Sequence, residues 1–175
     1  MLKKLSYYKD DNLKGSIGVE IVKAMLENSG YTVCHYGYEY TLLDLLSKSS
    51  YGKSKTPTGR MLAGSPDLLV YDKKDEIMLV EVKTRTKAKY LQKGEFILKS
   101  GEIERLKDFW SHSILVVVAP EGIFAQRASE IKIRENDYQH LSDFDKFQYI
   151  FKKVSSECKS HYEDIASQIL QIWMQ

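Results

Sequence analysis

The segment Ile114-Leu-Val-Val-Val-Ala119 places the strongest constraint on how this chain folds. It is a continuous apolar run of the length of one strand. Because neither side of such a strand can face water, both sides must be covered, as happens to a central strand of a sheet between layers of helices. The segment therefore predicts a layered α/β structure built around a sheet.

Helical periodicity supplies candidates for the covering layers. Apolar residues recur at spacings of three and four over residues 15–29, and Gly30 follows where a helix commonly ends. The same pattern predicts a helix around residues 103–110 and one or two amphipathic helices over residues 144–173. A short helix is also expected over residues 41–47.

Further strands are predicted beside the apolar run. Aromatic and β-branched residues favour a strand over residues 31–38. Residues 67–71 and 76–85 have the pattern of a hairpin around the polar turn 72–75, and a weaker strand pattern covers residues 123–133. The sum is an α/β sandwich around a mixed sheet.

The segment 49–64 interrupts these patterns. It is rich in Ser, Gly, Thr and Lys and contains Pro57, a composition that buries little surface and predicts a loop. Loops of this length inside a domain are usually functional or disordered. We therefore expect a mobile segment near a substrate.

Length and composition narrow the class of protein. The 175 residues fit one domain with a single core, and fractions of 43% hydrophobic and 29% charged residues exclude a disordered, collagen-like or membrane protein. No apolar run approaches the roughly 18 residues of a membrane span, and the polar start 1–12 is unlike a signal peptide. A cytoplasmic protein without membrane contact is expected, with Cys34 and Cys158 as free thiols.

Two carboxylates and a lysine are the candidate catalytic residues of the sequence. Period two puts Glu81 and Lys83 on one face of the predicted strand 76–85, among neighbours so apolar that ionised groups need pairing or a metal. Asp67 opens the partner strand, so the hairpin can return it beside Glu81. Oxygen ligands of this kind suit Mg²⁺, which also takes up phosphate oxygens. The constellation favours phosphodiester hydrolysis.

Ser65-Pro66-Asp67, followed fourteen residues later by Glu81-Val82-Lys83, resembles the PD-(D/E)XK nuclease superfamily. The resemblance implies an α/β, restriction-endonuclease-like fold, namely an αβββαβ core with a mixed sheet flanked by helices, plus C-terminal helices. Within a single domain spanning 1–175, the core would occupy 13–133 and a C-terminal helical extension 134–175.

The first predicted helix is similar to that of archaeal Holliday-junction resolvases, where Lys-Gly precedes a helix that carries a glutamate and ends in glycine and an aromatic residue. Lys14-Gly15, Glu20 and Gly30-Tyr31 correspond here. Four residues separate Gly15 from Glu20, whereas the family pattern has three.

The resemblance assigns roles to these residues. It implies that Asp67, Glu81 and the backbone carbonyl of Val82 ligate Mg²⁺ or Mn²⁺, and that Lys83 orients or deprotonates the attacking water. Glu20 would join the catalytic set by holding a second metal ion or its water. The implied activity is that of a Mg²⁺-dependent endonuclease acting on DNA, and a homodimer is compatible with it because cutting two strands requires two centres.

Positive charge is unevenly distributed although the formal net charge is only +2. Residues 83–107 include eight basic and only three acidic residues. We expect contacts with the nucleic-acid backbone from the basic residues after Lys83 and, with weaker support, from those of the segment 49–64. These are Arg85, Lys87, Lys89 and Lys93, and Lys53, Lys55 and Arg60.

Several alternatives remain open at this stage. Glu81 and Lys83 are also compatible with a simple same-face ion pair, Glu20 with a solvated surface charge, and the basic residues with a solvated face. A non-catalytic module that binds nucleic acid or protein on the same scaffold is the alternative to an enzyme, and a purely structural protein is a third. The sequence does not separate DNA from RNA or duplex from branched substrates.

Overall fold

The computed structural model describes residues 2–37, 56–72, 76–85, 94–134 and 137–172. The short helix expected over residues 41–47 lies outside these residues, as do residues 73–75 of the turn expected over 72–75, whereas Asp72 ends a strand.

Within the described residues, five strands form one mixed sheet in the order β1-β2-β3-β5-β6. Strands β1 (Thr32–His35), β2 (Leu68–Asp72) and β3 (Glu76–Thr84) are antiparallel neighbours. Strand β5 (Ile114–Ala119) pairs parallel with β3 and antiparallel with β6 (Gly122–Arg127). Every residue of β5 is buried, which confirms the prediction of a central strand.

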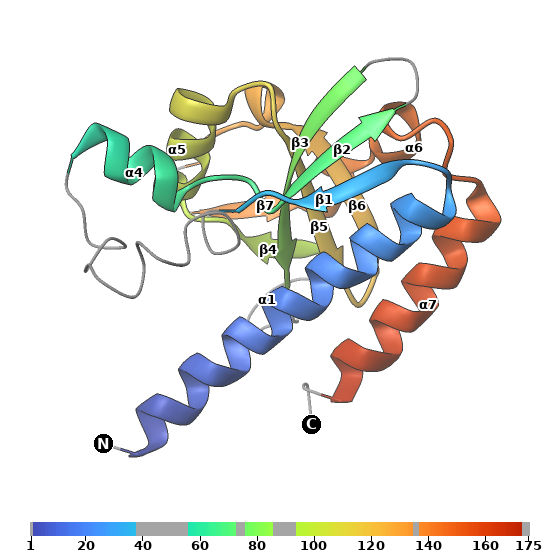
Figure 1. Cartoon of the computed structure of the whole chain (residues 1–175). Helices are drawn as coiled ribbons and strands as arrows, with labels where there is room; N and C mark the ends of the chain where they lie inside the picture. The colour runs from blue at the N-terminus through green and yellow to red at the C-terminus, as the bar shows by residue number, and fades with distance from the viewer. Residues whose placement is uncertain (1, 38–55, 73–75, 86–93, 135–136, 173–175) are drawn as a thin grey trace.

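Helices cover the two faces of the sheet (Figure 1). Helices α1 (Leu2–Asn28) and α7 (Ser156–Ile172) lie side by side over one face, where Val116 and Val118 join their core. Helix α5 (Ser100–Trp110) covers the other face, where Leu115 and Val117 pack with its apolar residues. Alternate residues of β5 thus belong to opposite cores, as the pleat of a strand requires. None of the described helices is long and apolar enough to cross a membrane.

Helix α1 begins at Leu2 and is therefore longer than the predicted helix 15–29. It ends before Gly30, whose φ of +84° is the left-handed conformation that glycine adopts freely. Gly18 permits a close approach to the sheet, because a Cβ atom built there would lie 1.9 Å from Thr84 Oγ1. A larger residue would require Thr84 to turn or α1 to move away from β3.

Part of the segment predicted as a loop is helical. Helix α4 (Pro57–Ala63) begins after Thr56, whose hydroxyl accepts a hydrogen bond from Gly59 N over 3.1 Å. Proline at the first helical position and threonine at the N-cap both favour a helix start. The loop prediction for 49–64 was therefore wrong over 57–63, because local capping outweighed the polar composition.

The strand predicted to reach Ile133 ends at Arg127. The 3₁₀ turn η2 (Ala128–Glu130) follows, and Ala128 N and Ser129 N donate to the carbonyls of Ser113 and Ser111. The chain thus leaves the edge of the sheet and folds over the start of β5. The hydrogen bonds that end the strand come from a distant loop, which the local pattern does not contain.

A helical extension was predicted for residues 134–175, but this segment also contains a strand. Strand β7 (Tyr138–His140) pairs antiparallel with β4 (Glu95–Ile97), and both are only three residues long. The 3₁₀ turn η3 (Leu141–Phe144) and helix α6 (Phe147–Ile150) follow before α7. Short strands of this kind carry too few alternating residues for recognition by period two.

Candidate active site

Glu81 and Lys83 project from β3 toward the face that α5 covers. Their cross-strand partners Leu115 and Val117 belong to the α5 core, whereas Val80 and Val82 belong to the α1 and α7 core. Lys83 Nζ lies 2.5 Å from Glu81 Oε1, and Glu81 is only 8% exposed. The prediction that the two charged groups share a face is confirmed, and in this structure they form an ion pair.

Asp67 is held next to this strand. Its Oδ2 accepts a hydrogen bond from Val82 N over 2.7 Å, and its backbone carbonyl accepts from Tyr36 N over 2.8 Å. Leu68 is paired with Val80, so the register extended by one residue sets Asp67 opposite Glu81. Residues directly opposite on one face have Cβ atoms roughly 4.5–5.5 Å apart. The hydrogen bond to Val82 N places the Asp67 side chain beside the strand that carries Glu81, as the hairpin prediction requires.

The Val82 carbonyl points to the same side of β3 as Asp67. In an antiparallel ladder the N–H and C=O groups of one residue face the same neighbouring strand, and Val82 N is directed at Asp67. The Asp67 carboxylate and the Val82 carbonyl are thus both directed to the gap between β3 and the start of β2, and Glu81 is the residue next to Val82 on β3. Carboxylate and carbonyl oxygens are the donors that hard divalent cations prefer.

The donor set fits Mg²⁺ or Mn²⁺ in type. Among the described residues no group of three His, Cys, Asp or Glu side chains could hold a metal ion. Mg²⁺ does not need such a group, because it is usually bound by one or two carboxylates and completes its shell with waters and phosphate oxygens. Lys83 now contacts Glu81 Oε1, so a metal ion on Glu81 would share this carboxylate with the ammonium group and be repelled by its positive charge.

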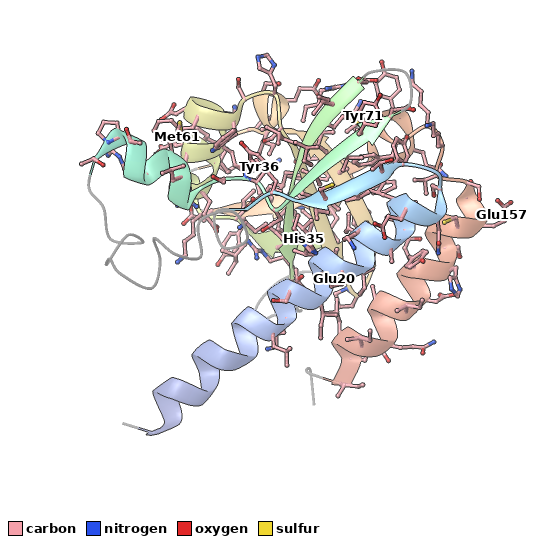
Figure 2. All side chains as sticks on the ribbon, viewed as in Figure 1. Glu20, His35, Tyr36, Met61, Tyr71 and Glu157 are labelled. Carbon is pink, nitrogen blue, oxygen red and sulfur yellow. The ribbon has the colours of Figure 1, made fainter. Side chains whose placement is uncertain are left out.

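Glu20 lies elsewhere. It is on α1, its side chain is 57% exposed, and its Oε1 lies 3.0 Å from His35 Nε2; Figure 2 shows the two residues where α1 passes β1. His35 is paired with Leu68 and so faces the α1 core, on the side of the sheet opposite Glu81. Among the described residues no hydrogen bond or ion pair from Glu20 to Asp67, Glu81 or Lys83 is found, and its metal-binding role stays a prediction.

Arg85, expected to contact nucleic acid, is used inside the fold. Its Nε donates to Ile97 O over 2.9 Å and its Nη1 to Thr84 O over 3.1 Å, which joins the end of β3 to β4. Burial lowers the pKa of this guanidinium, and the negative charge of Glu102, 3.8 Å from Nη2, opposes the shift. Lys53, Lys55, Lys87, Lys89 and Lys93 lie outside the described residues, and Arg60 is exposed on α4.

Glu102 is a neighbour of the site that the sequence did not reveal. Its Oε1 lies 4.0 Å from Lys83 Nζ, and its Oε2 accepts a hydrogen bond from Lys99 N over 3.2 Å. Glu102 stands three residues after Lys99, which is the position from which a glutamate caps the start of a helix, here α5. That local signal carries no information about Lys83, nineteen residues earlier in the chain.

Comparison with known proteins finds a distant structural likeness. The structure resembles Hjc, a Holliday junction resolvase from the archaeal hyperthermophile Archaeoglobus fulgidus, with a TM-score of 0.50 and 12% sequence identity, covering 82% of this chain and 99% of that chain. No family model and no curated protein matches the sequence. At this identity the likeness concerns the fold alone. The chain has the α/β architecture predicted for it, a mixed sheet flanked by helices.

The element order also matches the predicted core. Helix α1, the strands β1, β2 and β3, helix α5 and strand β5 follow one another as αβββαβ. Helix α4 is inserted between β1 and β2, and β4 between β3 and α5.

Proposed function

We propose that this protein is a divalent-metal-dependent nuclease that hydrolyses phosphodiester bonds in DNA. One observation supports the proposal above all: the Asp67 carboxylate accepts a hydrogen bond from Val82 N, the strand residue between Glu81 and Lys83, and these two residues share one face of β3. Two carboxylates and an ammonium group converging on one end of a sheet match the demands of phosphodiester hydrolysis, which are metal ligation and compensation of negative charge.

Each group has a distinct role in this proposal. Asp67, Glu81 and the Val82 carbonyl hold Mg²⁺ or Mn²⁺, which when bound polarises a phosphate oxygen and lowers the pKa of water. The Val82 amide fixes the Asp67 carboxylate in advance, so that little reorganisation is needed. Lys83 orients or deprotonates the attacking water, and its charge offsets that developing on the phosphate.

The structural likeness supports DNA as the substrate class. The Archaeoglobus protein of similar fold is, by its name, a Holliday junction resolvase. Branched DNA therefore belongs among the substrates to be tested, together with linear, nicked and single-stranded forms. The residues that follow β3 in the sequence would contact the phosphate backbone of the DNA; these are Lys87, Lys89 and Lys93.

We also propose that the chain is a single domain that acts in the cytoplasm as a homodimer. Pairing of β4 with β7 and packing of α7 on α1 join the segment after residue 133 to the rest of the chain, which supports one domain. The homodimer is proposed because cutting two strands requires two active centres. Sedimentation of the purified protein tests it.

Cleavage assays test the proposed activity. Labelled linear, nicked, branched and single-stranded DNA, with RNA alongside, would be incubated with Mg²⁺ or Mn²⁺ and the wild type, Asp67→Asn or Lys83→Ala. We expect metal-dependent cutting that falls at least about 100-fold in both variants, while Asp108→Asn, at an exposed position of α5, cuts like the wild type.

A second candidate is the non-catalytic module, and the ion pair between Lys83 and Glu81 favours it, because the ammonium group already balances the charge of a carboxylate that the nuclease proposal assigns to a metal. Metal-independent binding of DNA without cutting of any substrate would support this module and contradict the nuclease.

A further inference from the structure

Lys83 lies between two carboxylates. Its Nζ is 2.5 Å from Glu81 Oε1 on the same strand and 4.0 Å from Glu102 Oε1 on α5. The side chain of Lys83 is 21% exposed and that of Glu81 only 10%. A lysine side chain has four rotatable carbons, so its ammonium group can move from one carboxylate to the other without a change in the backbone.

The carboxylate of Glu102 is fixed in place by groups other than Lys83. Lys99 N, at the start of α5, donates to its Oε2, and Arg85 Nη2 lies 3.8 Å from the same oxygen. Arg85 is itself held by the carbonyls of Ile97 and Thr84. Glu102 therefore presents Oε1 toward Lys83 at a position set by the helix end and by the neighbouring strand.

The position of Glu102 affects how the Lys83 ammonium and a metal ion would compete for Glu81. A divalent cation and the Lys83 ammonium both require the same carboxylate, and two cations on one carboxylate repel each other. An ammonium group left without an anionic partner in a largely buried place is costly. The fold offers such a partner in Glu102.

We propose that Glu102 is a positioning residue that accepts the Lys83 ammonium when a divalent cation binds Glu81. Lys83 then stays at the site, charged and directed, instead of opposing the cation. The inference rests on the proposed function, because it takes Glu81 as a metal ligand. It adds a residue from α5 to a centre otherwise built from β2 and β3.

The alternative is that Glu102 serves the fold alone, by capping α5 and balancing Arg85. Glu102→Gln separates the two roles, because the amide keeps one oxygen acceptor for Lys99 N and replaces the charged oxygen that faces Lys83 by an uncharged NH2 group. Glu104→Gln is the matched control, since Glu104 lies on the same helix and is exposed. Circular dichroism of each full-length variant would establish that α5 and the rest of the fold are retained.

Mn²⁺ affinity measured by titration calorimetry tests the proposal in two backgrounds. In the wild-type background we expect Glu102→Gln to weaken Mn²⁺ binding about tenfold or more, and Glu104→Gln to leave it unchanged. In the Lys83→Met background no ammonium group needs a partner, so Glu102→Gln should weaken Mn²⁺ binding less than about threefold. Equal losses in the two backgrounds would overturn the proposal, because Glu102 would then act on the metal or the fold without Lys83.

A kinetic measurement adds a second readout. At saturating Mn²⁺, Glu102→Gln should lower kcat and leave the KM for DNA unchanged, because Lys83 acts on the reaction and not on binding. Failure of this inference and failure of the proposed function are distinguishable. Equal losses of Mn²⁺ affinity in a protein that still cuts DNA contradict only the role of Glu102, whereas absence of Mn²⁺ binding by the wild type contradicts both.

Discussion

The side chain of Asp67 accepts a hydrogen bond from the backbone amide of Val82, with 2.7 Å between Oδ2 and N. The bond ties the residue before β2 to the strand residue between Glu81 and Lys83. Asp67 thus has a structural role, as acceptor for a strand amide, besides the proposed chemical one. Suitable substitutions separate the two.

Asp67→Ala should destabilise the protein by about 1–3 kcal/mol, because it leaves the Val82 amide without its acceptor. Asp67→Asn keeps an oxygen acceptor and should cost less. Both variants should lose Mn²⁺ binding, since neither supplies a carboxylate. Denaturant unfolding and calorimetry measure the two effects, and an Asp67→Asn variant that binds Mn²⁺ like the wild type would contradict the proposed ligand set.

Divalent cations should stabilise the folded protein. A ligand that binds only the native state adds RT ln(1 + [L]/Kd), or about 1.4 kcal/mol at ten times the Kd. We expect the unfolding midpoint to rise with Mn²⁺ in the wild type and to stay constant in Asp67→Asn. A rise of the same size in both proteins would show that the ion binds elsewhere.

Gly18→Ala should destabilise the protein by about 1–3 kcal/mol, because the added methyl group meets Thr84, which must then leave its rotamer or move apart from α1. Gly15→Ala is the control on the same helix. No atom lies within 4 Å of its added Cβ, and alanine is the better helix former by about 0.5–1 kcal/mol, so this variant should be more stable than the wild type. Chemical denaturation measures both, and equal effects would contradict the close packing of α1 on the sheet.

Arg85→Met should destabilise the protein by about 2–3 kcal/mol. The change leaves the Ile97 carbonyl without its donor and Glu102 without a neighbouring cation. Arg60→Met, at an exposed position of α4, should change stability by less than about 0.5 kcal/mol. Unfolding in urea measures both, and similar small effects would indicate that Arg85 is free to serve nucleic acid instead.

Asp137 should make stability sensitive to acid. Hydrogen bonds from Ser100 Oγ and then Ser100 N lower the pKa of this carboxyl. Because the folded pKa lies below the unfolded value near 3.9, the contribution is complete above about pH 4 and is lost as the pH falls through the folded pKa.

The matching measurement is the free energy of unfolding from pH 7 downward. Asp137→Asn tolerates the left-handed backbone at this position, where φ is +58°, and should flatten the curve below about pH 4. Ser100→Ala removes one of the two donors and should produce part of the same change. A curve that neither variant alters would contradict the role of Asp137.

Much of the core was predictable because its signals are local. The apolar run of β5, the alternation that sets Glu81 and Lys83 on one face, and the glycine after α1 each depend on residues within a few positions of one another. The return of Asp67 to the strand of Glu81 followed from the short polar turn of the predicted hairpin.

Other features depended on contacts between distant segments. Strands β4 and β7 are recognisable only as partners of each other, and β6 ends where Ala128 N finds Ser113 O. Helix α4 was missed although its signal was local, since Thr56 and Pro57 mark a helix start that the polar composition concealed.

The sequence by itself determined the strands β1, β2, β3 and β5, their buried faces and the residues that carry the proposed chemistry, because strand periodicity and hydrophobicity act over a few residues. The tertiary structure decided which groups surround those residues. It turned Arg85 inward to bind carbonyls, paired Glu20 with His35, and brought Glu102 to Lys83. The physical reason is that these contacts join elements that are distant in the sequence. Packing of the two cores sets where each helix lies on the sheet, and this packing depends on the whole chain.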